Sequence, residues 1–274
     1  MDPRLLEVAV AAAQAGSEVL LRTFGSDDLQ VEQKARNDFV SRADRESESA
    51  IVDLILEAFP SHSILGEEGG VYAGSSGELE WVLDPLDGTS NFLRGVPYFC
   101  ISVACRRGPD TLVGVVLDPL RGDLFTAVAG EGSRRNGEAI HVRPAAGLKG
   151  AFLATGFPFK AHPALDAYLE VFREVFLEAQ AIRRCGAAAL DLAYTAAGIF
   201  DGFFEFRLAP WDLAAGCLLV QEAGGVATDL DGGSEYLSSG NVLAGAPGVH
   251  RDLLAVMARH AGEARMDELV PRSL

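Results

Sequence analysis

The stretch Trp81-Val82-Leu83-Asp84-Pro85-Leu86-Asp87-Gly88-Thr89-Ser90-Asn91-Phe92 decides how the rest of this chain is interpreted. It begins as an apolar strand and runs into two carboxylates, Asp84 and Asp87, which a proline turn separates. Buried carboxylates without a partner are costly, so a cation is expected where this strand ends. Because the proline fixes the turn, both carboxylates lie on the same side of the loop. The Leu86 carbonyl between them can then act as a third hard ligand.

Two further segments add acidic side chains, Gly66-Glu67-Glu68-Gly69 and Pro210-Trp211-Asp212-Leu213-Ala214-Ala215-Gly216. Taken alone, Glu67 and Glu68 are typical of a solvated loop. Asp212 alone is typical of a helix N-cap, worth about 1 kcal/mol. Together with the carboxylates of the first stretch, these acids predict one convergent site with enough oxygen ligands for two or three Mg²⁺ ions.

These strings, with Glu222-Ala223-Gly224-Gly225 after them, resemble the signatures of the inositol monophosphatase family. Its wider superfamily holds the lithium-sensitive and fructose-bisphosphatase-like phosphatases. The resemblance runs from Lys34 to about Gly245. It implies that Glu67, Asp84 and the Leu86 carbonyl hold a first metal ion. It further implies that Asp84, Asp87 and Asp212 hold a second ion and that Glu67 helps bind a weaker third. Hard oxygen ligands favour Mg²⁺ or Mn²⁺.

The same resemblance implies the roles of the catalytic pair. Thr89, paired with Asp44, is expected to orient and activate the attacking water. Lys34 is expected on a mobile loop that closes over the metal ions. Ser41 stands where the family often has Thr, and this change leaves Asp44 in place.

Substrate contacts are expected from both halves of the chain. The backbone N–H groups after Asp87 can bind a phosphate if a helix begins there. By resemblance, the second half would line the pocket and Glu205 would accept hydrogen bonds from hydroxyls. Arg184 and its neighbour Arg183 are candidates for a second anionic group, or else an ordinary strand-end charge pair. The predicted substrate-binding residues are Gly88, Thr89, Ser90, Gly186, Ala187, Glu205, Asp212 and Arg184.

The function expected from this resemblance is that of an inositol-1(or 4)-monophosphatase. This is a Mg²⁺-dependent hydrolase that cleaves myo-inositol monophosphate to inositol and phosphate by water attack. The alternatives are a fructose-1,6-bisphosphatase, a dual sugar-phosphate phosphatase and, with less support, a 3′-phosphonucleotide phosphatase. A non-enzymatic transcription- or RNA-associated partner is an alternative from another class. Lithium sensitivity and a homodimer are further implications of the resemblance.

Composition limits the partners, the cellular location and the state of the cysteines that are expected. A net charge of −16 argues against a nucleic-acid partner, because phosphate backbones require clusters of Lys and Arg. No apolar run reaches the roughly 18 residues that span a bilayer, and no signal peptide is visible. The four cysteines are expected to be buried, reduced thiols in a cytoplasmic protein. Cys100 and Cys105, five apart in one predicted strand, are expected on opposite faces.

The pattern of elements predicts an α+β chain with the layered αβαβα sugar-phosphatase fold. Residues 1–150 are expected to form a metal-binding half with a mostly antiparallel sheet, and residues 151–268 an alternating α/β half that completes the active site. The whole chain is expected to be one compact unit, and residues 269–274 resemble a cleavage tail. Predicted helices cover about residues 2–24, 44–59, 163–179, 187–198 and 211–223, with a last helix from 249. Residues 26–43 are predicted as a hairpin or mobile loop. Predicted strands cover about 81–84, 98–106, 112–117, 124–129, 139–142, 151–155, 181–184 and 202–206, with short strands near 226 and 242.

Overall fold

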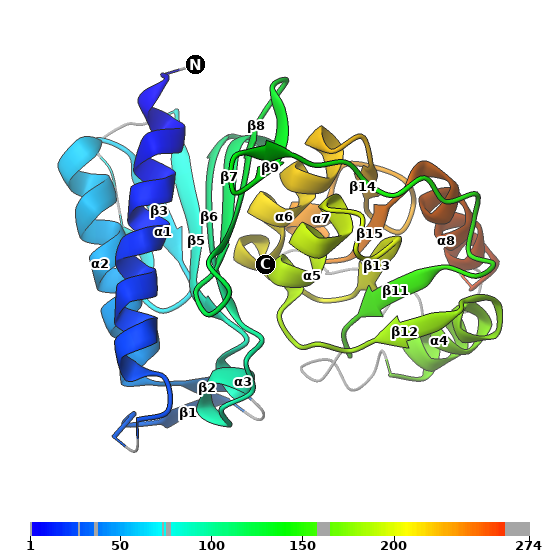
Figure 1. The fold of residues 1–274 in the computed structure, drawn as a ribbon, viewed down its shortest axis with the longest axis horizontal. Helices are drawn as coiled ribbons and strands as arrows, with labels where there is room; N and C mark the ends of the chain where they lie inside the picture. Colours follow the sequence, from blue (N-terminus) through cyan, green and yellow to red (C-terminus); the bar gives the residue numbers. More distant parts are fainter. Residues whose placement is uncertain are drawn as a thin grey trace.

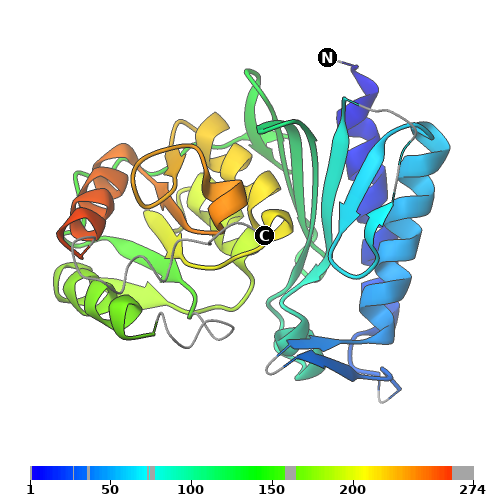
Figure 2. The same ribbon diagram turned by 180° about the vertical axis from the view of Figure 1, so that it is seen from behind.

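Helices and sheets alternate in five layers, as the computed structural model shows (Figure 1). Two long helices cover the outer face of a large sheet, and two more helices separate this sheet from a smaller one. A last pair of helices covers the far side of the smaller sheet; the reverse view shows the same order (Figure 2). The αβαβα fold predicted from the sequence is therefore confirmed. The structure describes residues 2–26, 28–35, 38–72, 74, 78–157 and 165–260.

The large sheet has eight strands in the order β10-β9-β8-β7-β6-β5-β3-β4. All neighbouring pairs are antiparallel except β3 and β5, which run parallel. Its strands are β3 (Ser63–Gly66), β4 (Gly70–Tyr72), β5 (Glu80–Asp87), β6 (Cys100–Arg107), β7 (Asp110–Asp118), β8 (Asp123–Val128), β9 (Gly132–Arg135) and β10 (Glu138–Ala139). A separate hairpin joins β1 (Glu32–Ala35) to β2 (Asp38–Val40), within the predicted hairpin region.

The smaller sheet has five strands in the order β12-β11-β13-β15-β14. The pairs β11–β12 and β11–β13 are parallel, and the remaining two are antiparallel. Its strands are β11 (Phe152–Thr155), β12 (Ala181–Arg183), β13 (Gly202–Glu205), β14 (Val226–Thr228) and β15 (Val242–Gly245).

The helices are described by their places in the layers. The first outer layer holds α1 (Arg4–Thr23) and α2 (Arg42–Ala58), the middle layer α5 (Ala188–Ala196) and α6 (Pro210–Glu222), and the last layer α4 (Leu165–Glu178) and α8 (Pro247–His260). Two short helices are α3 (Thr89–Leu93), directly after β5, and α7 (Tyr236–Ser239). Among the described residues no helix is long and apolar enough to cross a bilayer.

Alternation along the strands divides the core between the layers. Ile101, Val103 and Cys105 of β6 pack toward α1 and α2, whereas Cys100 and Ala104 pack toward α5 and α6. This is the period of two expected for a sheet buried on both faces. It confirms that the two cysteines lie on opposite faces. The prediction of four buried thiols is wrong at one position, because Cys185 is only partly buried.

Several element boundaries differ from the prediction for local reasons. Helix α2 begins at Arg42, because Ser41 is its N-cap and the carboxylate of Asp44 accepts the Ser41 N–H at 2.8 Å. The predicted strand at 139–142 ends at Ala139. Beyond that point Val142 N–H bonds to the Ala223 carbonyl of the middle layer, so the chain leaves the sheet. The start of the predicted helix 163–179 and the tail 269–274 lie outside the described residues.

Candidate active site

The end of strand β5 brings together the first two carboxylates. The pairing with β6 is interrupted between Asp84 and Asp87, so the two residues between them leave the regular ladder. The Leu86 N–H donates to Asp84 at 2.9 Å and closes the turn. Asp84 is 1% exposed and Asp87 is 8% exposed. The proline-linked pair is therefore buried, as a metal site would require.

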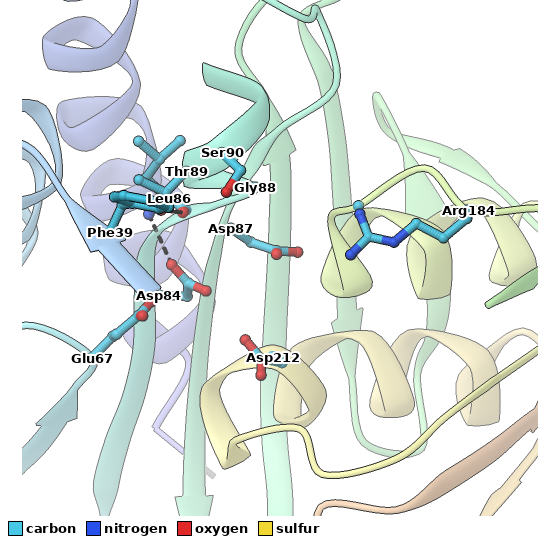
Figure 3. A pocket seen from close by; sticks show the side chains of 11 residues that line it. Phe39, Glu67, Asp84, Leu86, Asp87, Gly88, Thr89, Ser90, Arg184 and Asp212 are labelled. Atoms are coloured by element: carbon cyan, nitrogen blue, oxygen red, sulfur yellow. Dashed lines mark hydrogen bonds between the residues drawn. The ribbon is translucent and has the colours of Figure 1, made fainter. Parts of the chain in front are cut away.

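The parallel pairing of β3 with β5 positions Glu67. Gly66, the last residue of β3, is opposite Leu83, the residue before Asp84. Because β3 and β5 run parallel, Glu67 follows the end of β3 directly beside Asp84, where the regular pairing of β5 with β6 is interrupted. Figure 3 shows the two side chains close together at this edge.

Asp212 reaches the same point from the middle layer. The N-cap of α6 is Ala209 and not Asp212, which is the third residue of the helix and accepts the Ala209 N–H at 2.7 Å. Carboxylate oxygens of Asp84, Asp87 and Asp212 all lie within 4.8 Å of one another. The three acids converge on one space in Figure 3. Asp212 therefore stabilises the first turn of its helix and also belongs to the cluster of converging acids.

The mutual repulsion of the carboxylates in this cluster favours the binding of a positive charge. Burial, followed by repulsion from Glu67, Asp87 and Asp212, raises the pKa of Asp84 well above its ordinary value. Burial raises the pKa of Asp87 to about 6, although the Ala189 N–H, at 2.7 Å, favours the charged form. A divalent cation would offset this repulsion. Carboxylate and carbonyl oxygens are the ligands that Mg²⁺ and Mn²⁺ prefer, so the residues present fit such an ion.

Thr89 and Asp44 form a hydrogen-bonded pair beside the acids. The Thr89 hydroxyl lies 3.0 Å from an Asp44 carboxylate oxygen and 3.1 Å from the Leu86 carbonyl oxygen. Asp44 is fully buried, and the Ser41 hydroxyl donates to its second oxygen at 2.6 Å. Burial raises the pKa of Asp44, and these hydrogen bonds counter the rise. The arrangement can hold a proton acceptor at the edge of the cleft.

Lys34 contacts the loop that carries Glu67. Its ammonium group lies 2.6 Å from Glu68 and 3.4 Å from Glu67. Burial raises the pKa of Glu68 to about 7, an effect that the Lys34 hydrogen bond opposes. The β1–β2 hairpin is therefore linked to the acidic loop by ion pairs.

A cleft of about 200 Å³ opens over these groups. Its lining includes most of the predicted residues: Glu67, Asp84, Leu86, Asp87, Gly88, Thr89, Ser90, Arg184, Gly186 and Asp212. Arg184 points into it from the side opposite Glu67 (Figure 3). Ala187 is 1% exposed, and neither it nor the half-buried Glu205 is among the lining residues. Burial raises the pKa of Glu205, and Arg184 opposes that rise.

Phe39 also lines the cleft, and the sequence reasoning assigned it no role. It belongs to β2, between Lys34 and Asp44, where an apolar residue in a polar segment was the available signal. The ring bounds the cleft on the hairpin side.

Comparisons with known proteins agree with this geometry. A family model described as the inositol monophosphatase family matches residues 2–263. The chain is 44% identical over 261 residues to the Nus factor SuhB of Escherichia coli K12, covering 95% of this chain and 98% of the relative. The extragenic suppressor protein suhB of Bartonella henselae has a TM-score of 0.89 at 39% identity, covering 92% of this chain and 98% of the other. The Thermotoga maritima IMPase has a TM-score of 0.84 at 33% identity, covering 94% and 98%.

The fold and the acidic cleft define the class of the metal-dependent phosphatases. Within this class the chain belongs to the inositol monophosphatase family.

Proposed function

We propose that this protein hydrolyses a phosphate monoester of a cyclic polyol, with myo-inositol monophosphate as its substrate and Mg²⁺ as its cofactor. The observation that carries the proposal is the convergence of Asp84, Asp87 and Asp212 beside the Thr89–Asp44 pair in one cleft. Phosphate monoester hydrolysis is extremely slow without a catalyst, so charge neutralisation and positioning are what a protein must supply.

Each residue has a definite role in this proposal. Glu67, Asp84, Asp87, Asp212 and the Leu86 carbonyl would hold two or three divalent ions. Bound there, the ions would acidify water and neutralise the negative charge of the phosphoryl group. Thr89 holds the attacking water by hydrogen bonding, and its hydroxyl is oriented by Asp44. Gly88 and Ser90 line the cleft, and their peptide N–H groups would contact the phosphate.

Substrate choice is proposed from the opposite wall. Arg184 lies there with Gly186, and the half-buried Glu205 is close enough to interact with Arg184 electrostatically. One solved relative is described as inositol monophosphate bound SaIMPase-II, at 27% identity and a TM-score of 0.79. Another is 2'AMP bound SaIMPase-II, at 26% identity and a TM-score of 0.80. Both ligands are phosphate monoesters on hydroxyl-bearing rings, which supports a substrate of this class.

A bisphosphate sugar is the second candidate. Arg184 could receive a second phosphate, but Glu205 draws on the same positive charge. We therefore favour a substrate with one phosphate and neutral hydroxyls.

A role in transcription complexes is the candidate from another class. It is supported by the name Nus factor SuhB, which several relatives at 43–44% identity carry. The net charge of −16 argues against direct RNA binding, so such a role would operate through protein contacts. Asp84→Asn should leave a protein partner bound in a pull-down. Loss of the partner in this variant would tie that role to the metal site. The homodimer and the cytoplasmic location stay predictions.

The test is phosphate release from inositol 1-phosphate and from fructose 1,6-bisphosphate across a Mg²⁺ titration. Mg²⁺-dependent turnover that is faster with the monophosphate, and absent in Asp84→Asn, is the expected result. Wild-type protein that is folded and binds Mg²⁺ but cleaves neither substrate would contradict the proposal.

A further inference from the structure

A buried carboxylate beneath the acidic loop has no part in the roles described above. Glu48 lies on α2 and is 2% exposed. One of its oxygens accepts the Glu68 N–H at 2.9 Å, and the other accepts the Gly69 N–H at 2.5 Å and the Tyr72 hydroxyl at 2.9 Å. Three donors, two from the loop and one from β4, therefore bind a single side chain.

The glycines of that loop are shaped around the same carboxylate. A Cβ atom on Gly66 would lie 2.6 Å from one Glu48 oxygen, and a Cβ atom on Gly69 would lie 2.7 Å from the other. Contacts this short do not occur at real Cβ atoms, so neither position has room for a side chain. Gly66 is therefore required by the proximity of Glu48, and Gly69 by the proximity of Tyr72 and, beside it, Glu48.

Glu67 is consequently held on both sides along the chain. Before it, Gly66 is fixed by pairing with β5. After it, the Glu68 N–H is fixed by Glu48. Because both neighbours are held, the backbone of Glu67 is fixed where its side chain lies close to Asp84 (Figure 3).

Helix α2 also holds the other parts of the site. One turn before Glu48, the Asp44 carboxylate accepts the Thr89 hydroxyl. Between them, the Ser47 hydroxyl donates to the Pro85 carbonyl at 2.9 Å, inside the turn that links the two strand-end acids. One helical segment thus contacts both the turn at the end of β5 and the Glu67 loop, which are far apart in the sequence.

We propose that Glu48 is a positioning residue for metal binding, which sets the Glu67 loop against β5 so that Glu67 and Asp84 can share a cation. This inference rests on the proposed role of Glu67 as a ligand. Outer groups that orient ligands typically contribute about 10- to 100-fold to metal affinity.

The chemistry requires a carboxylate at this position. Ionised oxygens accept several hydrogen bonds at once, and these bonds are stronger than those to a neutral acceptor. In Glu48→Gln one oxygen becomes an amide nitrogen, which has only donors to offer. If the remaining oxygen keeps Gly69 and Tyr72, the Glu68 N–H faces another donor, and the turn after Glu67 loosens.

The experiment compares Glu48→Gln with Glu46→Gln, a matched change on the exposed side of the same helix. Glu46 pairs with Arg22 and Arg42 at the surface and touches no part of the site. Mg²⁺ affinity is measured by calorimetry, and amide hydrogen exchange at Glu68 and Gly69 is measured in the metal-free protein. Glu48→Gln should weaken Mg²⁺ binding about 10-fold or more and speed exchange at both amides. Glu46→Gln should change neither.

Measurements of phosphatase activity then distinguish a positioning role of Glu48 from a general loss of folded structure. In Glu48→Gln the Mg²⁺ concentration for half-maximal activity should rise with the lost affinity, while kcat at saturating Mg²⁺ recovers. Unchanged Mg²⁺ affinity, or lower kcat with normal affinity, would overturn the inference. If Glu48→Gln does not fold, Tyr72→Phe replaces it, because this variant removes one of the donors to Glu48. It should show a smaller loss of Mg²⁺ affinity, and unchanged affinity in Tyr72→Phe would equally overturn the inference. Absence of Mg²⁺ binding or turnover in the wild type would instead refute the proposed function.

Discussion

The hydroxyl of Thr89 donates a hydrogen bond of 3.0 Å to the carboxylate of Asp44, a residue 45 positions earlier in the chain. Asp44 is fully buried and is also bound by Ser41 through its N–H and its hydroxyl. The orientation of Thr89 at the cleft is therefore fixed by the first turn of α2.

Thr89→Ala should reduce kcat by about 10²- to 10⁴-fold, because the group that orients the attacking water and passes on its proton is lost. Thr89→Ser keeps the hydroxyl and should retain most of the activity. Steady-state kinetics at saturating Mg²⁺, with calorimetry of Mg²⁺ binding, makes the comparison. A Thr89→Ala variant with wild-type kcat would contradict the assigned role.

Asp84→Asn should abolish Mg²⁺-dependent turnover and yet stabilise the metal-free protein. The change removes one of several buried negative charges that repel one another. The side-chain oxygen can still accept the Leu86 N–H. A gain of about 1 kcal/mol would raise the melting temperature by about 2–4 °C in a chain of this size.

The matched control is Asp118→Asn. Asp118 is also buried, but Arg121 pairs with it at 2.8 Å. This substitution should lower the melting temperature, because it leaves a partly desolvated cation without its anion. Equal effects of the two changes would refute the electrostatic explanation.

The metal-free protein should become less stable as pH rises from about 5 to about 8. Burial raises the pKa of Asp87 to about 6 and that of Asp191 to about 8, from an ordinary value of 3.8. A carboxyl whose pKa is higher in the folded state gives its full stability below the unfolded value. That stability is lost as pH rises through the folded value. At about 1.4 kcal/mol per pH unit for each group, the loss over this range should be on the order of 5 kcal/mol, most of it from Asp191.

Thermal melts in EDTA and in Mg²⁺ at several pH values check this expectation. Mg²⁺ should flatten the part of the curve that belongs to Asp87, since a cation favours its charged form. Asp191→Asn should flatten the curve up to about pH 8, most clearly above pH 6, and the amide oxygen can still accept the Tyr98 hydroxyl. A metal-free protein that gains stability across this range would contradict the raised pKa values of Asp87 and Asp191.

Arg184→Ala should lower kcat/KM by about 10-fold, equivalent to about 1.4 kcal/mol, mainly through a higher KM. The loss should be larger for fructose 1,6-bisphosphate than for inositol 1-phosphate, because the second phosphate needs a cation more than a hydroxyl does. Arg183→Ala is the neighbouring control: Arg183 is exposed and lies over the ring of Phe152, outside the cleft. Equal losses in the two variants would remove Arg184 from substrate binding.

The sequence was sufficient to predict the residues of the cleft that lie in motifs. The apolar run before Asp84 predicted a strand that ends in acids, and the structure has β5 in that place. The strands β3 and β4 were not predicted, although strands as short as β12 and β14 were, because the glycines that bracket Glu67 and Glu68 indicate a loop. The motifs predicted that Glu67 converges with Asp84, but without β3 they did not show that the parallel pairing of β3 with β5 places the two residues side by side.

Glu48 could not have been assigned from the sequence for a different reason, whereas Phe39, an apolar residue in a polar segment, had a signal that could have been used. A glutamate inside an amphipathic helix has the same pattern whether it faces solvent or a loop. Its burial depends on β4 and the Glu67 loop, which pack against α2 from elsewhere in the chain. Ala187 shows the reverse, because its motif was clear but its side chain is covered.

The middle helical layer, α5 and α6, determines what happens when the chain is cut into two fragments. Every residue of α5 is buried, as is most of α6, because each helix packs against both sheets. A break near residue 150 would give one fragment with Asp84 and Asp87 and another with Asp212. Each fragment would expose a face that only the other can cover. The two pieces should therefore be insoluble apart and regain phosphatase activity only when they are produced together. For the same reason, a chimera of two relatives joined at this point should carry both halves in one continuous chain.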